Sequence, residues 1–274
     1  MKSFFLVGNS EKDGIKKALF NLEKEIESKG GVCYKSYGYI DTNDFPAVDS
    51  VITLGGDGTL IRAARDISHL GIPIIGINMG HMGYLTSINK AGDIKNMVDI
   101  LINDEYFIEK RMMISATVIR DGKEIRTLNA LNEAVITRLE RLKTIRCNVY
   151  IDGDFLNEYS SDGIIVATPT GSTAYNLSAG GPIIEPSSKM MLITAICPHA
   201  LIQRSIVLST SKVIRISFND NLKSNRELVV DGDESVILEN KDVIELRESE
   251  IYAGLIKLKK GSFLDNIRNK MNRI

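Results

Sequence analysis

The 274-residue sequence has no tryptophan, only three cysteines and no long apolar segment. The cysteines, Cys33, Cys147 and Cys197, form no CxxC pair and are odd in number, which argues against a disulfide framework and favours a reducing compartment. The longest apolar segment, residues 190–202, is shorter than the roughly 18 residues of a membrane span. The first residues lack the apolar core of a signal peptide. We therefore expect a cytoplasmic protein with no membrane segment.

Net charge is also nearly absent, because 34 basic residues stand against 35 acidic ones. No global field then draws the protein to nucleic acid or to a membrane surface, and an anionic ligand must be held locally. The three histidines have no metal-ligand spacing to one another or to cysteine, so no protein-bound metal centre is predicted. The length and the 43% hydrophobic content favour two globular domains.

The first third of the chain alternates short apolar segments with helical patterns. This alternation is typical of an α/β domain with an open parallel sheet. The expected elements, in chain order, are a strand at 3–8, a helix at 15–26, strands at 32–37 and 50–54, a helix at 59–70 and a strand at 72–77.

From about Glu109 onward the pattern changes to alternating, β-branched segments. Asp-Gly pairs between such segments are a hairpin signal and predict a β-rich, sandwich-like second domain. We place the first domain at residues 1–109 and the second at 110–250. The basic tail, residues 257–273, is interpreted as a half-buried, solvated helix rather than a nucleic-acid patch. The four Asp-Gly pairs that give the hairpin signal are Asp121-Gly122, Asp152-Gly153, Asp162-Gly163 and Asp231-Gly232.

The turn after the apolar segment 51–54 is the first feature that indicates chemistry. Ligands of open α/β sheets bind beyond the carboxyl ends of strands, and glycines with a following helix N-terminus favour a phosphate. A glycine-rich turn can also be a plain connector. Asp57 favours the functional interpretation, because a carboxylate there can accept a hydroxyl proton or help to hold a metal. The residues of this turn are Gly55, Gly56, Asp57, Gly58 and Thr59.

Other nucleotide-binding signatures are missing from the sequence. There is no GxxxxGK[ST] loop, no GxGxxG after the first strand and no HRD or DFG motif. The segment 161–182 instead runs from an apolar strand into a loop rich in hydroxyl groups and glycine. This loop can hydrogen-bond a sugar and pack a base against Tyr175, although its composition also fits a surface loop.

Five blocks then occur in one order: GGDGT at 55–59, NMGHMGYL at 78–85, Asn132-Glu133, Asp162-Gly163 and TPTGSTAY at 168–175. Together they resemble the family of ATP- or polyphosphate-dependent NAD kinases over about residues 50–235. The GGDGT turn has counterparts in diacylglycerol kinases, sphingoid lipid kinases and 6-phosphofructokinases. The long TPTGSTAYNLSAGGP segment is far more specific.

The resemblance implies that the chain phosphorylates the 2'-hydroxyl of the adenosine ribose of NAD with ATP, giving NADP. It makes Asp57 the proton acceptor, and it places the ATP phosphates along Gly55, Gly56, Gly58 and Thr59. Further expected NAD contacts, at less constant positions, are Tyr84, Lys143, Ser160 and Asp233, the last standing where many relatives have glutamine or histidine. The main implied NAD contacts are Asp57, Gly58, Asn132, Glu133, Asp162, Thr173, Ala174, Tyr175, Asn176, Leu177 and Ser178.

The resemblance also implies an architecture and partners. It implies an α/β domain and a β-rich domain with the ligand between them, and a last segment, 251–274, that returns to the first domain. It further implies a divalent cation, Mg²⁺, with ATP, and a homodimer or homotetramer. Two alternatives stay open: a lipid or sugar kinase with the same GGDGT turn, and a non-catalytic NAD-binding regulator. The loop around Tyr175 argues against the first, and Asp57 argues against the second.

Overall fold

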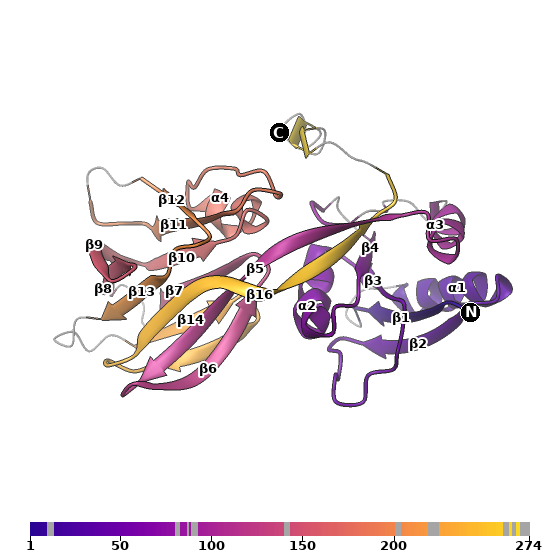
Figure 1. Cartoon of the computed structure of the whole chain (residues 1–274), viewed down its shortest axis with the longest axis horizontal. Coiled ribbons are helices and arrows are strands. Elements are labelled where there is room, and N and C mark those ends of the chain that lie inside the picture. Colours follow the sequence, from indigo (N-terminus) through magenta and orange to yellow (C-terminus); the bar gives the residue numbers. More distant parts are fainter. Residues whose placement is uncertain are drawn as a thin grey trace. The chain divides into compact units, whose positions relative to one another are not determined.

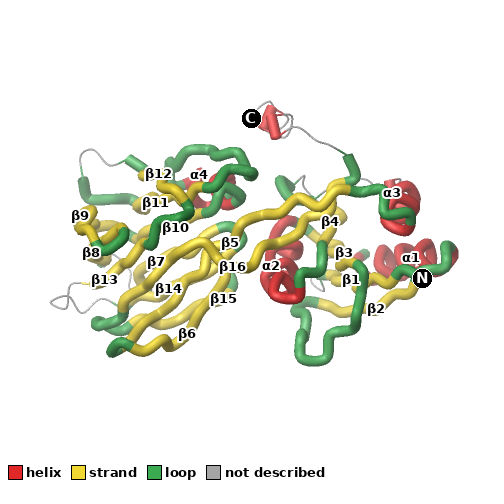
Figure 2. Tube along the Cα trace, viewed as in Figure 1, coloured by secondary structure: helices red, strands yellow, loops and turns green. Residues whose placement is uncertain are grey.

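The computed structural model of the chain contains two compact units (Figure 1). Unit 1 consists of Met1–Arg111 and Ile251–Ile274, and unit 2 of Met112–Glu250. The residues that the structure describes are 1–9, 14–79, 83–86, 88, 93–139, 143–200, 204–218, 225–259, 263–264 and 267–268. Helices are concentrated in unit 1 and strands fill most of unit 2 (Figure 2). The predicted fold class, α/β followed by β-rich, is confirmed.

Unit 1 is built on a parallel sheet with the strand order β2-β1-β3-β4-β16. The last strand joins at Leu255, which is in register with Ile74. Buried apolar side chains dominate the three strands β1, β3 and β4, as expected of the part of a sheet that is covered on both faces. The strands are β1 (Ser3–Gly8), β2 (Val32–Tyr37), β3 (Ser50–Gly55), β4 (Ile74–Asn78) and β16 (Val243–Lys257).

The helices of unit 1 are α1 (Ile15–Ser28), α2 (Asp57–Ile67) and α3 (Ile94–Ile102), with a 3-10 turn at Ser68–Leu70. Strands β1 and β2 have the predicted bounds, and the other predicted strands and the first two helices are present with shifted ends. The strand predicted at 72–77 begins at Ile74, because Gly71 adopts a left-handed conformation (φ 69°) and Pro73 has no N–H to donate. Helix α2 begins at Asp57, two residues earlier than predicted.

The two faces of this sheet carry different helices. Ile75, Ile77 and Ile256 pack in one cluster with the apolar side chains of α1 and α3. Residues of the alternate set point to the other face, where a Cβ at Gly76 would lie 2.7 Å from the Leu60 side chain of α2. We call this second side the α2 face.

Unit 2 is a sandwich of antiparallel strands. One sheet has the order β12-β11-β10-β7-β14-β15, and the other layer contains β16-β13-β8-β9 together with the β5–β6 hairpin. Apolar side chains from both layers form one core cluster. Strands that contribute to unit 2, besides β16, are β5 (Phe107–Arg120), β6 (Lys123–Ala130), β7 (Glu133–Arg138), β8 (Ile145–Ile151), β9 (Asp154–Ser161), β10 (Gly163–Ala167), β11 (Met190–Ile196), β12 (Ile206–Ser209), β13 (Ile214–Phe218), β14 (Arg226–Val230) and β15 (Glu234–Leu238).

Three of the four Asp-Gly pairs form hairpin turns. Asp121, Asp152 and Asp231 have φ values of 48°, 52° and 50°, and each is followed by a glycine with positive φ. The pair Asp162-Gly163 is the exception, because it leads from β9 in one sheet to β10 in the other. Asp162-Gly163 therefore forms no hairpin turn, and neither of its residues has a positive φ.

The interpretation of residues 257–273 as one helix is wrong at its start. Strand β16 continues through Lys257, and Lys259 lies in a bend. Beyond them, the structure describes helical backbone only at 263–264 and 267–268.

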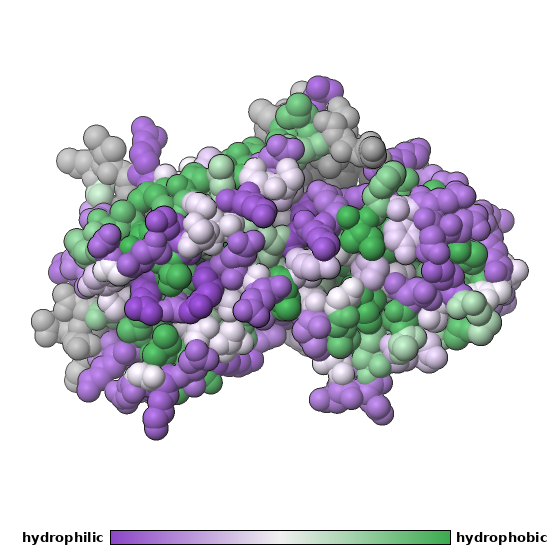
Figure 3. All heavy atoms as spheres, viewed as in Figure 1, coloured by the Kyte–Doolittle hydropathy of each residue, from purple (hydrophilic) through white to green (hydrophobic). Residues whose placement is uncertain are grey.

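The face of the molecule in Figure 3 shows hydrophilic side chains interspersed with smaller hydrophobic groups in both units. Such a mixed surface agrees with the nearly balanced charge of the sequence. Within the described part of the chain, no helix is both long enough and apolar enough to cross a membrane.

Candidate active site

The glycine-rich turn connects β3 to α2 at the carboxyl edge of the parallel sheet. The N–H groups of Thr59 and Leu60 donate to the carbonyl oxygen of Gly56 at 3.1 and 3.3 Å and start the helix. Gly55, Gly56 and Gly58 all lack the positive φ that would make glycine obligatory. At Gly55 the requirement is space, because a Cβ there would collide with the Thr59 side chain. The turn is therefore tight through packing rather than through unusual backbone angles.

The carboxylate of Asp57 is bound by a segment far away in the sequence. Its Oδ2 accepts a hydrogen bond from the N–H of Tyr84 at 2.5 Å. Its Oδ1 accepts from the N–H groups of Leu85 and Thr86 at 3.1 and 3.2 Å. A side chain at Gly83 would collide with this carboxylate, so the close approach requires glycine. The predicted proton acceptor is thus held in one orientation.

This arrangement leaves Asp57 able to do chemistry. A carboxylate offers about four lone-pair sites, and the three N–H donors occupy two on Oδ1 and one on Oδ2. Among the described residues none occupies the second site on Oδ2, which is available to a hydroxyl proton or a cation. Mg²⁺ in phosphoryl-transfer enzymes is commonly held by one or two carboxylates together with the substrate phosphates, so a single open carboxylate oxygen fits a Mg²⁺ that arrives with ATP.

In unit 2, Asn132 lies in the turn before β7 and Glu133 is the first residue of that strand; they are 8% and 6% exposed. Asp231, in the hairpin between β14 and β15, binds this turn. Its carboxylate accepts hydrogen bonds from the N–H groups of Leu131 at 2.9 Å, Asn132 at 2.8 Å and Glu133 at 3.2 Å. The Asn132 carbonyl in turn accepts from the N–H of Thr168 at 2.8 Å. Two predicted contact residues are therefore fixed at their backbone.

The Glu133 side chain lies in an apolar, anionic environment. Burial and the neighbouring Asp231 carboxylate raise its pKa from 4.5 to about 8, although a hydrogen bond from the Tyr175 N–H works in the opposite direction. Among the described atoms, Oε2 is buried and has no hydrogen-bond partner. A buried oxygen without a partner is costly, and a ligand hydroxyl or amide can supply the missing bond.

The predicted loop contains a 3-10 turn, Gly171–Thr173, and the short helix α4, Tyr175–Ser178. Tyr175 is 44% exposed and Leu177 39%, and Ser178 is exposed too, whereas Thr173 and Ala174 are partly buried. The backbone bond from Tyr175 to Glu133 joins this loop to the Asn132-Glu133 turn. The structure therefore brings together two separately predicted parts of the site.

Asn176 differs from its neighbours in the loop. Its side chain is fully buried, donating to the carbonyl oxygens of Ser172 and Pro182 at 3.2 Å each and accepting from the Thr194 hydroxyl at 2.7 Å. Its side chain therefore stabilises the loop from within, and contact of Asn176 with NAD stays a prediction.

The other predicted contacts are more scattered. Asp162 accepts from Arg138 Nη2 at 2.9 Å, and Ser160 lies 3.4 Å from the Thr144 hydroxyl. Lys143 is exposed, and Asp233 donates its N–H to the Val230 carbonyl within the β14–β15 hairpin. The central part of the NMGHMGYL block, with His81, lies outside the described residues.

Sequence reasoning missed three residues near these groups: Gly83, Arg138 and Asp231. Asp231 was noted only as a hairpin residue. Its position directly after the apolar strand 226–230 was the available signal, since an aspartate at a strand end can accept backbone N–H groups as well as shape a turn. Gly83 stood within the NMGHMGYL block without an assigned role and Arg138 had no signal, because both roles depend on tertiary contacts.

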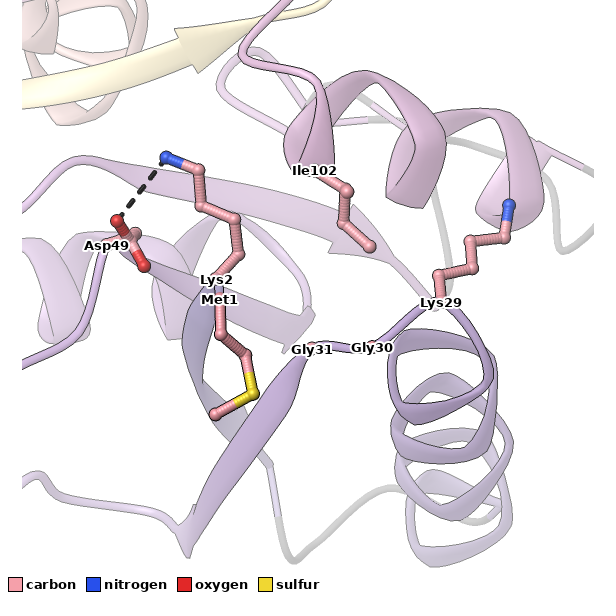
Figure 4. Close-up of a pocket in the computed structure, with 7 residues that line it drawn as sticks. All are labelled: Met1, Lys2, Lys29, Gly30, Gly31, Asp49 and Ile102. Carbon is pink, nitrogen blue, oxygen red and sulfur yellow. Dashed lines mark hydrogen bonds and ion pairs between the residues drawn. The ribbon is translucent and has the colours of Figure 1, made fainter.

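A separate hollow in unit 1 is a weaker candidate (Figure 4). It lies at the amino ends of β1 and β2, whereas ligands of parallel sheets bind at carboxyl ends. Its two lysines are already paired: Lys2 lies 2.8 Å from Asp104 and 3.4 Å from Asp49, and Lys29 bonds to Asp99. We therefore assign no ligand to it.

Residues 5–106 match the family described as ATP-NAD kinase N-terminal domain, and residues 131–258 match the ATP-NAD kinase C-terminal domain. An NAD kinase from Thermoanaerobacter sp. (strain X514) is 40% identical over 252 residues, covering 91% of this chain and 87% of the relative. The chain belongs to the NAD kinase family. An NAD kinase from Lachnospira eligens is 38% identical and covers 99% of this chain and all of its own.

Solved structures of NAD kinase relatives share the fold. A yeast NADH kinase complexed with NADH has a TM-score of 0.86 at 21% identity, over 99% of this chain and 88% of its own. An NAD kinase from Archaeoglobus fulgidus in complex with ATP has a TM-score of 0.78 at 23% identity, with both chains fully covered. At these identities the likeness establishes the NAD kinase fold of this chain.

Proposed function

We propose that the protein is an NAD kinase that transfers the γ-phosphoryl group of ATP to the 2'-hydroxyl of the adenosine ribose of NAD. The observation that carries this function is the Asp57 carboxylate, which three backbone N–H groups orient and which keeps one acceptor site on Oδ2. Family membership and relatives named NAD kinase at about 40% identity support it over a lipid or sugar kinase. A non-catalytic regulator would have no use for this carboxylate.

In the reaction, Asp57 Oδ2 accepts the proton of the 2'-hydroxyl as that oxygen bonds to the γ-phosphorus. The bond between the γ-phosphorus and the bridging oxygen breaks, and ADP leaves. Phosphoryl transfer needs alignment and charge neutralisation more than covalent help from the protein. A divalent cation, when bound with ATP, neutralises charge on the phosphate oxygens. The turn of Gly55, Gly56, Gly58 and Thr59 binds the phosphates through its backbone.

The NAD molecule is bound by residues of unit 2. Tyr175 supplies an exposed aromatic face for a base, and Asn132, Glu133 and Asp162 supply polar groups for ribose and amide. We place the predicted residues Thr173, Ala174, Leu177 and Ser178 at the same ligand through the exposed side of their loop. Tyr84, Lys143, Ser160 and Asp233 remain proposed contacts.

Other properties follow from the family resemblance and the chemistry. We assign the protein to the cytoplasm, because its three cysteines are all free thiols and cysteines stay reduced in that compartment. Burial raises the pKa of the Cys33 and Cys147 thiols to about 12, which keeps them unreactive. We also assign it a homodimeric or homotetrameric state, which light scattering coupled to gel filtration would measure.

The test is direct: pure protein is incubated with NAD and Mg-ATP, and the product is measured with an NADP-specific dehydrogenase. NADP should form in proportion to enzyme, and omission of either substrate should abolish it. Parallel assays with diacylglycerol and fructose 6-phosphate should give no phosphorylated product. Repeated failure to form NADP, with a folded protein, would refute the function.

A further inference from the structure

The loop of residues 171–184, which we call the Tyr175 loop, packs on one face of the sheet that contains β10 and β11 (Figure 1). This face is apolar, and Ile184 of the loop lies against it. Leu192 and Ile196 of β11 belong to the face, so Thr194 between them points to the same side. Thr194 is only 3% exposed. A buried hydroxyl in an apolar face is costly unless it is hydrogen-bonded, so this threonine calls for a partner.

The partner of the Thr194 hydroxyl is the Asn176 side chain in the Tyr175 loop. Thr194 Oγ1 lies 2.7 Å from Asn176 Oδ1, and Ser205 Oγ lies 2.8 Å from the same hydroxyl. An amide oxygen can only accept, so Thr194 is the donor to Asn176. Because Asn176 is fully buried, solvent cannot supply another donor to this oxygen. The hydroxyl therefore ties the loop to β11.

Asn176 uses its amide nitrogen to close the loop. Nδ2 donates to the carbonyl oxygens of Ser172 and Pro182, at 3.2 Å each. A Cβ at Gly181 would collide with the amide, so the chain is wrapped closely around this side chain. One amide thus holds residues on both sides of α4, and the bond from Thr194 fixes that amide to the sheet.

Tyr175 precedes Asn176 in the short helix α4. The Tyr175 side chain is 44% exposed, whereas Asn176 is fully buried, so the two neighbours point in different directions. The N–H of Tyr175 also donates a hydrogen bond to Glu133. A displacement of Asn176 would therefore move both the exposed aromatic ring and the donor that Glu133 accepts from.

We propose that Thr194 is a positioning residue for NAD binding, because its hydroxyl holds Asn176 against β11 and thereby sets where the loop presents Tyr175. This inference rests on the proposed kinase function and adds a residue outside the segments predicted from the sequence. A loop held in its binding conformation binds more tightly than one that the ligand must order. Asp57 and the glycine-rich turn belong to unit 1, so the effect should appear in NAD affinity rather than in the use of ATP.

The test compares Thr194→Val, which removes the hydroxyl, with Thr194→Ser, which keeps it. NAD affinity is measured by calorimetry, and kcat, KM for ATP and melting temperature are measured beside it. Thr194→Val should weaken NAD binding on the order of 10-fold, because a buried amide oxygen loses its donor. KM for ATP, and kcat at saturating NAD, should change less than about twofold. Thr194→Ser should stay within about twofold of the wild type in NAD affinity, because the donor is retained.

Thr117→Val is the matched control. Thr117 Oγ1 lies 2.9 Å from Thr127 Oγ1 on the β5–β6 hairpin, so the same exchange removes one hydroxyl of a bonded pair elsewhere in unit 2. NAD affinity should match the wild type. Hydrogen exchange gives a readout that needs no ligand: residues 171–184 should exchange faster in Thr194→Val, but not in Thr117→Val. If Thr194→Val does not fold, Thr194→Cys replaces it, and its weak S–H donor should give a smaller loss of NAD affinity.

The outcomes separate a positioning role from a purely structural one. A lower melting temperature with unchanged NAD affinity in Thr194→Val would overturn the inference, because the hydroxyl would then only stabilise the fold. NAD binding as weak in Thr194→Ser as in Thr194→Val would also overturn it, since the methyl group would then be responsible. If the wild type binds NAD but forms no NADP, and Thr194→Val still binds NAD more weakly, the proposed function fails and the positioning role stands.

Discussion

Asp231 and Glu133 are joined by two backbone-anchored hydrogen bonds of opposite direction. The N–H of Glu133 donates to Asp231 Oδ1 at 3.2 Å, and the N–H of Asp231 donates to the Glu133 carbonyl at 3.0 Å. The same carboxylate holds Leu131 and Asn132. A hairpin aspartate therefore determines where the Asn132-Glu133 pair stands.

Asp231→Asn should lower NAD affinity roughly 10- to 100-fold, because a charged acceptor of three N–H groups becomes an amide with one acceptor oxygen. KM for ATP should change little. Asparagine tolerates the left-handed backbone, so the hairpin itself persists. Asp121→Asn is the matched control: it alters an Asp-Gly hairpin with nearly the same φ, 48° against 50°. Equal NAD titrations for both variants and the wild type would contradict a positioning role.

Glu133 gives the protein a defined pH dependence. Its pKa is about 8 in the folded protein and 4.5 ordinarily, so between these values the folded state holds a proton that the unfolded state has lost. The free energy of unfolding should therefore fall as pH rises from about 4.5 to about 8, by on the order of a few kcal/mol at most.

Glu133→Gln keeps the neutral form at every pH and should remove this slope. Melting temperatures of the two proteins between pH 5 and pH 9 measure this slope. The melting temperature of the wild type should fall relative to that of the variant as the pH becomes alkaline. Parallel curves would show that Glu133 is ionised in the folded protein across the whole range.

Asp57→Asn should reduce kcat on the order of 100- to 10,000-fold with a modest change in NAD affinity, because the amide cannot accept the hydroxyl proton. If Asp57 served only to hold a cation, excess magnesium would restore much of the rate. If it served only to brace residues 84–86, the melting temperature would fall while turnover stayed near normal.

Gly83→Ala provides a companion that keeps the carboxylate. The added Cβ collides with Asp57 and must displace either the carboxylate or residues 84–86. Turnover should fall by on the order of 100-fold, since a shift of about 1 Å at a reacting group is costly. Steady-state kinetics with saturating NAD and ATP measure the effect, and normal kcat would show that the orientation of Asp57 is unimportant.

Tyr175→Ala should weaken NAD binding by roughly 1–3 kcal/mol if a base stacks on the ring. KM for ATP should change less. Tyr34→Ala is a suitable control, because Tyr34 is 43% exposed against 44% for Tyr175 and lies in β2 of unit 1. Fluorescence or calorimetric titration with NAD distinguishes the two variants. An identical NAD affinity in both would show that no base of NAD stacks on Tyr175.

The sequence predicted those features that depend on local pattern. Apolar periodicity located α1 and the strands β1 to β4 of the parallel sheet, and three of four Asp-Gly pairs formed hairpins. The sequence pattern did not distinguish Asp162-Gly163 from the other three pairs. The difference is tertiary, because the strands before and after it, β9 and β10, belong to different sheets.

Side-chain roles that depend on distant contacts were harder to predict. The family resemblance implies an NAD contact for Asn176, but no sequence pattern indicated that Ser172, Pro182 and Thr194 engage its polar side-chain atoms. Lys257 was grouped with a basic tail, and only the sheet register places it on the α2 face. The reason for glycine at position 55 could not be predicted either, because it is the space that the Thr59 side chain occupies.

Strand β16 has a consequence for the order in which the protein is made. Its residues 251–257 complete the parallel sheet of unit 1, but the ribosome adds them only after the whole of unit 2, Met112–Glu250. At ~5–20 residues per second this interval lasts on the order of 10 s. During that time the nascent sheet exposes the edge of β4, which invites wrong pairing.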